Sequence, residues 1–371
     1  MLYALLLVLL VNVINVVGID ENIAISSEQV QVPVIDISSF LNGDQESRIN
    51  VAKKIGKACI DVGFFVIIGH GVDDNIIQQA WNSTRDFFDL SEEEKKEYIT
   101  KSEAEYPFGY SQFGGEVLSA GKAADPTVSN DVANGYNSKA PDLKEMFSLG
   151  PGNPLAGFPA RRWPSKPVDF ESSWTKYYDT MANLASQLLK ACAIALELPD
   201  ENYFDQFIDH HASALRALNY PHLENYVPMP GQLRASAHTD YGSLTILRSD
   251  SPGLQVSKDK YPPNWHDVPF VENGFIVNLG DLMKRWTNDV WLSTLHRVVN
   301  PPLPEGGEEC TSSTRRQSMA FFHNLNRDAV VRVLNSDNPK YEPIIAGDFL
   351  MQKHLAAQGR GGEEEKRDKN T

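Results

Sequence analysis

The chain has 371 residues, 42% of them hydrophobic, and a formal net charge of -15 at pH 7. This length allows one large domain or two modest ones, and the apolar content is ample for a buried core. Lysine and arginine are scattered rather than gathered into a stripe that could follow a phosphate backbone, which argues against a nucleic acid partner. The distant cysteines Cys59, Cys192 and Cys310 form no C-x-x-C pair, so a zinc-thiolate site is excluded and free thiols are expected.

Residues 1–18 form an apolar run that is interrupted only by Asn12 and Asn15. The run is long enough for the core of a signal peptide, but no basic residue precedes it and Val17-Gly18 matches a cleavage site poorly. It is also short for a membrane-spanning helix. A signal peptide, a short membrane anchor and a cytosolic or misassigned extension therefore stay open. Secretory or membrane-associated localisation and membrane contact are expected only if this segment is genuine and retained, and a cytoplasmic protein is expected otherwise.

The next segments alternate between strand and helix patterns. Val32–Phe40 predicts a short buried strand, residues 46–60 a helix, and residues 64–71 a second strand. Asp73 or Asp74 can cap a helix that runs to Phe88 and contains the sequon at Asn82, and Ser91 with Glu94 predicts a capping box for a third helix. This front end resembles the N-terminal domain of the non-haem dioxygenase family that includes isopenicillin N synthase, and we expect that domain over residues 32–150. Within it, Lys101–Asn137 predicts a long loop that shapes a substrate mouth together with strands around Trp286.

The second half of the chain predicts a helix followed by many short strands. Residues 170–198 place large apolar side chains on one wide face, and Pro199 ends the pattern. From Ala214 onward, short β-rich runs separated by Pro and Gly are typical of a jelly roll. We therefore expect a mainly β fold with flanking helices: a double-stranded β-helix (jelly roll) core over residues 168–355, with an N-terminal α/β cap region. The polar, Gly-rich residues 358–371 predict a disordered tail.

The run AHTDYGSLTIL carries the first chemical signal. It predicts an extended strand, so His238 and Asp240 are expected to point to the same face because side chains alternate. Together with a distant second imidazole, assigned to His296 in STLHRVVNPP, they would form the two-His-one-carboxylate triad, which leaves coordination positions on iron(II) open for oxygen chemistry. Each of these residues alone would more often be a polar turn or a core residue.

The run RRQSMAFF repeats this spacing with different chemistry. Arg316 and Ser318 are two residues apart and so share one face of an apolar strand. A guanidinium inside a barrel needs an anion, and its planar fork matches a carboxylate, so a dicarboxylate oxoacid fits. A structural salt bridge is the alternative for Arg316 taken alone.

The order HTD, HRVVNPP and R-x-S with an aromatic pair resembles the iron(II)/2-oxoglutarate-dependent dioxygenases of the isopenicillin N synthase-like superfamily. The resemblance runs from Val32 to about Met351 and is supported by GLQV and NLGDLMKRWTNDVWLSTLHR, which are similar to family strands. It implies iron on His238, Asp240 and His296, and 2-oxoglutarate reaching Arg316 and Ser318, with Tyr220 in LNYP near the cosubstrate. The family tyrosine often follows its Asn by two residues, whereas Asn219 and Tyr220 are adjacent.

The segment between His296 and Arg316 is about twice as long as the family leads one to expect and contains PEGGEECTSST, which we interpret as a lengthened hairpin loop. If the insert changed the strand register, Arg315 would compete with Arg316 for the anion. His70, in IIGHG, resembles a structural position of the family beside a turn. The other histidines lack partners at ligand spacing and are expected to be surface residues or satisfied core residues: His210, His211, His222, His266, His323 and His354.

The implied activity couples oxidative decarboxylation of 2-oxoglutarate to hydroxylation, desaturation or cyclisation of a small organic molecule, with Fe(II) and O2 and with no catalytic residue beyond the metal centre. Two alternatives stay open. One is an oxidase similar to isopenicillin N synthase, in which Arg316 and Ser318 hold a substrate carboxylate. The other is a jelly-roll binding protein without turnover. No G-x-S-x-G elbow or dinucleotide loop is present, which argues against a hydrolase or a Rossmann enzyme.

Overall fold

The computed structural model describes residues 30–99, 108–116, 140–223, 226, 228–259, 262–302 and 313–357. The described residues from Val32 onward belong to one compact unit. The apolar segment at residues 1–18, most of the loop at Lys101–Asn137, most of the insert before Arg316 and the tail at residues 358–371 lie outside the described residues. Among the helices that the structure describes, none has both the length and the apolar character needed to cross a bilayer.

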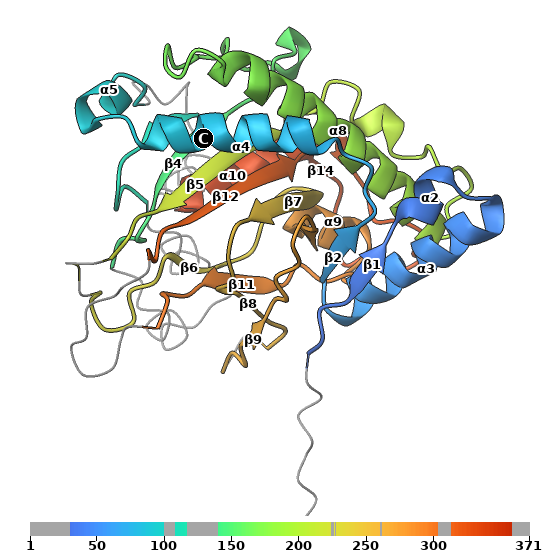
Figure 1. Ribbon diagram of the computed structural model, residues 1–371. Helices are drawn as coiled ribbons and strands as arrows, with labels where there is room; N and C mark the ends of the chain where they lie inside the picture. Colours follow the sequence, from blue (N-terminus) through green and yellow to red (C-terminus); the bar gives the residue numbers. More distant parts are fainter. Residues whose placement is uncertain are drawn as a thin grey trace, which may run out of the picture. The chain divides into compact units, whose positions relative to one another are not determined.

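A large mixed sheet forms the centre of the fold (Figure 1). Only its first two strands are parallel, and each of the other neighbouring pairs is antiparallel. In spatial order the strands are β1 (Val34–Asp36), β2 (Phe64–Ile68), β10 (Phe275–Leu279), β7 (Leu244–Ser249), β12 (Arg316–His323), β5 (Ala214–Tyr220), β4 (Glu145–Leu149) and β3 (Gly109–Ser111). The N-terminal strands therefore extend the same sheet to which the later strands belong.

A smaller antiparallel sheet carries two of the predicted metal ligands. Its order is β6 (Ala235–His238), β11 (Leu295–Val298), β8 (Leu254–Ser257) and β9 (His266–Asp267). A separate pair joins β13 (Val330–Val331) to β14 (Ile344–Ile345). The mainly β character with flanking helices agrees with the prediction.

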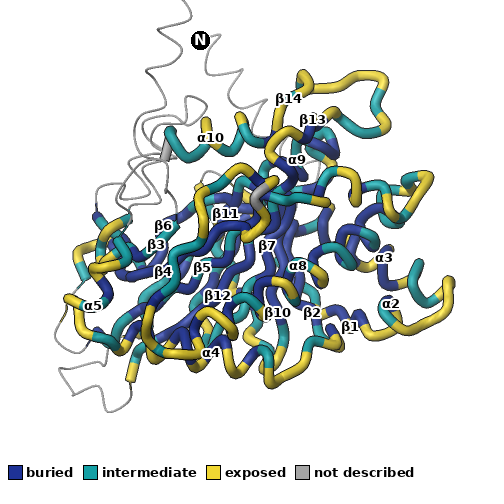
Figure 2. Tube along the Cα trace, turned by 90° about the horizontal axis from the view of Figure 1, so that it is seen from above, coloured by how far each residue is buried: buried dark blue, intermediate teal, exposed yellow. Residues whose placement is uncertain are grey.

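Helices cover the outer face of the large sheet. The longest, α8 (Phe170–Ala195), packs against α3 (Gln45–Asp61), α4 (Asp74–Phe88), β12 and β7. Figure 2 shows the buried strands β5, β12 and β7 passing through the middle of the molecule. The shorter helices are α2 (Ser38–Asn42), α5 (Glu92–Lys96), α9 (Asp281–Trp286) and α10 (Ala346–Ala357), and two 3-10 turns span Pro154–Ala156 and Asp205–Phe207.

Alternation along β12 separates its two faces. Phe321 points outward, where its ring lies 5.1 Å from that of Tyr178 on α8, and Met319 accepts a hydrogen bond from Thr84 on α4. The residues that alternate with them, Ser318 and Ala320, must face the opposite way, into the space between the two sheets. Burying the outward set against α8 and α4 therefore fixes which β12 residues line the interior.

Local signals were predicted well at helix starts. The Asp73 side chain caps α4, and Ser91 with Glu94 forms the predicted capping box at the start of α5. The sequon at Asn82 lies inside α4, with Ser83 and Thr84 buried. Described cysteines Cys59 and Cys192 are buried free thiols.

Three predictions about strands were wrong in part. Val32–Phe40 is a strand only at Val34–Asp36, because α2 starts at Ser38, where the Asp36 carboxylate accepts from the Ser38 backbone N–H. AHTDYGSLTIL is not one strand: β6 ends at His238, a turn follows, and β7 begins at Leu244. The segment before His296 contains helix α9, so Trp286, expected among strands at a substrate mouth, is instead a buried helical residue stacked edge-on against Phe204.

Candidate metal centre

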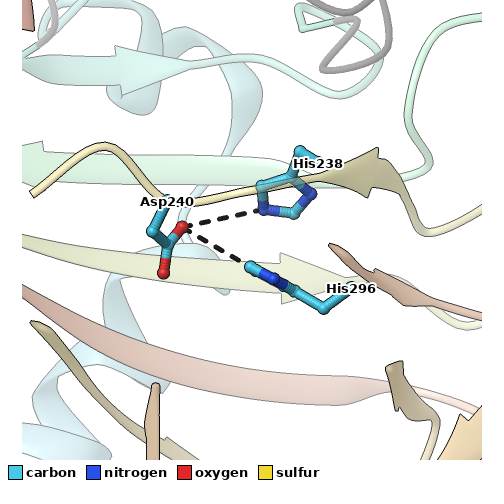
Figure 3. A group of neighbouring side chains, drawn as sticks. All are labelled: His238, Asp240 and His296. Carbon is cyan, nitrogen blue, oxygen red and sulfur yellow. Dashed lines mark ion pairs between the residues drawn. The ribbon is translucent and has the colours of Figure 1, made fainter. Parts of the chain in front are cut away.

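Three predicted ligands converge in the small sheet and the turn beside it. His238 and His296 are direct partners in the β6–β11 register, and Asp240 lies in the turn after β6. The Asp240 Oδ1 atom is 4.0 Å from His238 Nε2 and 3.7 Å from His296 Nε2 (Figure 3). One ligand atom from each residue lies within 4.8 Å of the others, and no other such metal-binding group of His, Cys, Asp or Glu is found among the described residues.

Backbone carbonyls fix the orientation of both imidazoles. His238 Nδ1 lies 2.7 Å from the carbonyl oxygen of Ser236, and His296 Nδ1 lies 3.0 Å from that of Thr294. Because a carbonyl oxygen only accepts, each Nδ1 must carry the proton and donate it. Each Nε2 then presents a lone pair toward Asp240, which is the tautomer a metal ligand needs.

The Asp240 carboxylate is oriented by two donors. Its Oδ2 accepts from the Thr245 hydroxyl at 2.6 Å and from the Asn278 amide at 2.7 Å, which leaves Oδ1 for the histidines. Burial opposes ionisation, but His296, His238 and these hydrogen bonds hold the pKa of Asp240 below its ordinary value. The carboxylate is therefore in the anionic form that binds a cation.

His238 is in the complementary, neutral state. Burial, followed by the neighbouring His296, lowers the pKa of His238 to about 3. A neutral imidazole is the form that coordinates a metal. Two imidazoles and one carboxylate on one side of a buried site match the donor set of non-haem iron(II) oxygenases, so these residues fit the metal that the sequence predicts.

The second predicted group lies on the inner face of β12. Arg316 is 1% exposed, and its Nε donates to the carbonyls of Ser251 and Pro252 at 3.2 Å. Its Nη1 and Nη2 are buried and have no hydrogen-bond partner. Tyr220 is opposite Arg316 in the β5–β12 register, with its ring centre 5.1 Å from the guanidinium carbon. A buried guanidinium with two unused nitrogens calls for an anionic ligand.

Arg315 points to the other face. Its Nε donates to Asn219 at 2.8 Å and its Nη1 to Asp89 at 2.6 Å, both outside the interior. Between the two arginines, the strand register directs Arg316 inward. Asn219 also faces outward, where it donates to Glu145 at 2.7 Å, so the inner position on β5 belongs to Tyr220.

Sequence reasoning missed the residues that support the ligands. Asn278 is the one polar residue in the fully buried strand FIVNL, and that pattern could have identified it. Thr245 could have been found from the alternation in β7, where it shares a face with Leu247. The expectation of satisfied histidines was wrong for His211 Nδ1, His266 Nε2 and His323 Nε2, which are buried atoms without a hydrogen-bond partner.

Comparisons with known proteins agree with this geometry. The family model described as "non-haem dioxygenase in morphine synthesis N-terminal" matches residues 32–176, and that of the "2OG-Fe(II) oxygenase superfamily" matches residues 212–325. Validamycin A dioxygenase of Streptomyces hygroscopicus subsp. limoneus is 30% identical over 292 residues, covering 76% of this chain and 75% of that protein. The 2-oxoglutarate-Fe(II) type oxidoreductase hxnY of Emericella nidulans is 28% identical over 338 residues, covering 88% and 90%.

Solved structures give the same result for the fold. A full-length Neurospora crassa protein, crystallised in complex with alpha-KG and thymine, has a TM-score of 0.75 and 33% identity, covering 90% of this chain and 98% of that chain. Structural neighbours of this kind are 2-oxoglutarate oxygenases, which confirms the predicted jelly-roll core. The chain therefore belongs to the iron(II)- and 2-oxoglutarate-dependent oxygenase superfamily and is an oxidoreductase of that superfamily.

Proposed function

We propose that His238, Asp240 and His296 bind the iron(II) of this oxygenase and that Arg316 and Ser318 hold the far carboxylate of 2-oxoglutarate, with Tyr220 beside it. The observation that carries the proposal is the pairing of a buried His-Asp-His cluster with a buried guanidinium whose Nη1 and Nη2 have no partner. A dicarboxylate oxoacid satisfies both, because one end can reach the metal while the other accepts from the arginine fork.

With iron(II), 2-oxoglutarate and O2 bound, the centre would supply the four-electron reduction of O2, with two electrons from the oxidative decarboxylation of 2-oxoglutarate to succinate and CO2 and two from the oxygenation of a small molecule. The protein's own residues orient the participants. Thr245 and Asn278 hold the Asp240 carboxylate, and the backbone carbonyls hold the two imidazoles in the metal-binding tautomer. Burial of Arg316 keeps water from competing for the carboxylate.

A small polar molecule is the proposed primary substrate, and hydroxylation is the proposed outcome. Arg216 lies on the same face of β5 as Tyr220, four residues away. It therefore also faces the space between the two sheets, at the end away from Arg316. It donates to Ser148 at 2.9 Å and faces Glu116 at 3.5 Å. Burial opposes ionisation of Glu116, but Lys144 and Arg216, with a smaller effect from His238, lower its pKa to about 2. Charged groups beside the metal ligands suit a polar substrate.

Names of relatives support the same class. They include homoarginine-6-hydroxylase of Oryza sativa subsp. japonica and validamycin A dioxygenase, and the Neurospora crassa structure contains thymine. We further propose that residues 32–150 serve as a cap region for the jelly-roll region at residues 168–355, because β4 and β2 join the large sheet beside β5 and β10.

The test is a turnover assay with 1-labelled 2-oxoglutarate and iron(II) against a panel of polar metabolites, with release of labelled CO2 and succinate as the readout. We expect oxygen-dependent release that at least one panel member stimulates and that Asp240→Ala abolishes. Absence of oxygen-dependent succinate with every panel member would rule out the proposed cosubstrate chemistry.

A further inference from the structure

Arg234 is a buried cation inside the same interior. It directly precedes β6, and alternation puts Arg234, Ser236 and His238 on one face of that strand. Arg234 is 4% exposed, one of its terminal nitrogens donates to the Thr314 carbonyl, and its Nε is buried with no hydrogen-bond partner. This residue is not a metal ligand, because a guanidinium offers only hydrogen-bond donors.

Arg234 and Arg316 flank one aromatic ring. Their guanidinium carbons lie 5.8 Å and 5.1 Å from the centre of the Tyr220 ring. Three buried nitrogens around this ring therefore lack an acceptor: Nε of Arg234 and both terminal nitrogens of Arg316. Within the described part of the chain, no carboxylate hydrogen-bonds either guanidinium. The charge of Asp250 acts on Arg234, but its carboxylate accepts instead from Arg85 and from the Gln317 backbone N–H.

Two like charges in one dry site repel each other. Burial first, and then the charge of Arg316, lowers the pKa of Arg234 to about 10, so Arg234 remains a cation at neutral pH. An arrangement of this kind is costly unless an anion joins it. A carboxylate offers two oxygens with about four acceptor sites, of which the Arg316 fork uses two. A further N–H donor can therefore share the same carboxylate.

We propose that Arg234 is a second anchor for the far carboxylate of the oxoacid, so that Arg234 and Arg316 clamp it together. This inference rests on the proposed function of Arg316. The Arg234 side chain is held at the Arg316 end of the interior by its hydrogen bond to the backbone carbonyl of Thr314, two residues before Arg316. The other end, where Arg216 lies, is left for the primary substrate.

The clamp makes the site selective for oxoacids with a second carboxylate. 2-Oxoglutarate neutralises one of the two positive charges and supplies acceptors for both side chains. 2-Oxopentanoate, which has a methyl group in place of that carboxylate, leaves both guanidiniums unpaired in a buried site. Arg234 therefore contributes to binding of the dicarboxylate and not of the monocarboxylate.

The test is calorimetric titration of 2-oxoglutarate and of its non-oxidisable analogue N-oxalylglycine into the anaerobic protein loaded with Mn(II). Loss of one charge-assisted hydrogen bond predicts roughly ten- to hundredfold weaker binding of both compounds for Arg234→Gln. Arg234→Lys, which keeps the charge but not Nε, is expected to recover part of this loss. Arg248→Gln is the matched control, because Arg248 faces outward over the Trp81 ring, and it is expected to bind like the unmodified protein.

A double-mutant cycle tests whether Arg234 and Arg316 bind the same carboxylate. If Arg234 and Arg316 share one carboxylate, the losses from Arg234→Gln and Arg316→Gln are non-additive. If Arg234→Gln leaves the affinity for both compounds unchanged while Arg316→Gln weakens it, the clamp is refuted and the proposed function stands. If neither substitution changes the affinity, both are refuted. Melting temperatures without ligand identify any variant that fails to fold.

Discussion

The amide of Asn278 donates to Oδ2 of Asp240 at 2.7 Å, the carboxylate oxygen that the Thr245 hydroxyl also contacts and that does not face the histidines. This bond joins the inner face of β10 in the large sheet to the turn after β6 in the small sheet. The geometry of the metal centre therefore depends on how the two sheets are packed together.

Replacing Asn278 with Leu should weaken metal binding. The substitution keeps the approximate volume but removes the donor, so the Asp240 carboxylate is free to rotate. Loss of such a supporting contact typically costs about 10- to 100-fold in metal affinity. Competition with a metal-binding dye measures this loss, and Asn202→Ala at an exposed asparagine is the control. Unchanged affinity in the Asn278 variant would show that Thr245 alone is sufficient.

Replacing His238 with Ala should remove iron binding altogether at micromolar metal. Only His296 and Asp240 would remain, and two ligands do not hold iron(II) against water. Metal content after gel filtration measures the effect, and His210→Ala, a partly exposed histidine paired with Asp209, is the control. Stoichiometric iron in the His238 variant would contradict the assignment of this residue as a ligand.

Arg316→Lys should raise the KM for 2-oxoglutarate while the KM for the primary substrate stays close to its original value. Lysine keeps the positive charge but cannot offer the planar fork that matches a carboxylate. We expect a rise of roughly ten- to hundredfold, the effect of one lost charge-assisted hydrogen bond. A change confined to the KM of the primary substrate would instead assign Arg316 to that substrate.

The buried ion pair between Lys95 and Glu145 predicts a large effect on stability. The two groups are 2.8 Å apart and 5% exposed, and Glu145 also accepts from Tyr110 and Asn219. Lys95→Met leaves the buried Glu145 carboxylate without its cationic partner and should lower the free energy of unfolding by about 3–5 kcal/mol. The double variant with Glu145→Gln should be less affected, because the uncompensated charge is gone.

Urea unfolding measures both variants. The exposed pair Lys57–Asp61, with side chains 77% and 45% exposed, is the control, and Lys57→Met should change the free energy of unfolding by less than about 1 kcal/mol. If Lys95→Met costs no more than Lys57→Met, Glu145 is sufficiently stabilised by its other donors.

The sequence was most informative where local chemistry decides the structure. The Ser91 and Glu94 capping box and the apolar periodicity of α8 depend only on neighbours along the chain, and both were confirmed. The convergence of His238 with Asp240 was predicted from a single strand that does not exist. A turn after β6 brings Asp240 to the two histidines instead, and turns of this kind are determined by contacts with β7 and β10.

Other parts of the site could not be predicted from one sequence. Asn278 and Asp240 are 38 positions apart in the sequence, and Arg234 lies beside Tyr220 only because the small sheet faces the large one. No periodicity within a strand encodes such contacts between sheets. Resemblance to a family indicated which residues to propose as ligands, but it gave no signal for Arg234, which appears in the sequence as an ordinary residue before a strand.

Acid sensitivity provides a further test through His323. This residue is fully buried beside Ser243, and burial first, then His211, lowers its pKa to about 3 from an ordinary value of 6.5. In the unfolded chain His323 takes up a proton as the pH falls through about 6.5, whereas the folded protein does not until about pH 3. The stabilising contribution is therefore complete above about pH 6.5 and is lost progressively as the pH falls toward 3.

The expected slope is at most about 1.4 kcal/mol per pH unit for this one group. His323→Asn keeps a polar atom near the Ser243 hydroxyl but does not titrate, so its free energy of unfolding should fall less steeply between pH 6.5 and 4 than that of the unmodified protein. Urea unfolding at a series of pH values, both proteins being metal-free, measures the difference. His222→Asn, a partly buried histidine bonded to Thr314, controls for the loss of a histidine as such. Parallel pH profiles for the His323 variant and the unmodified protein would show that His323 is protonated in the folded state and that water reaches its ring.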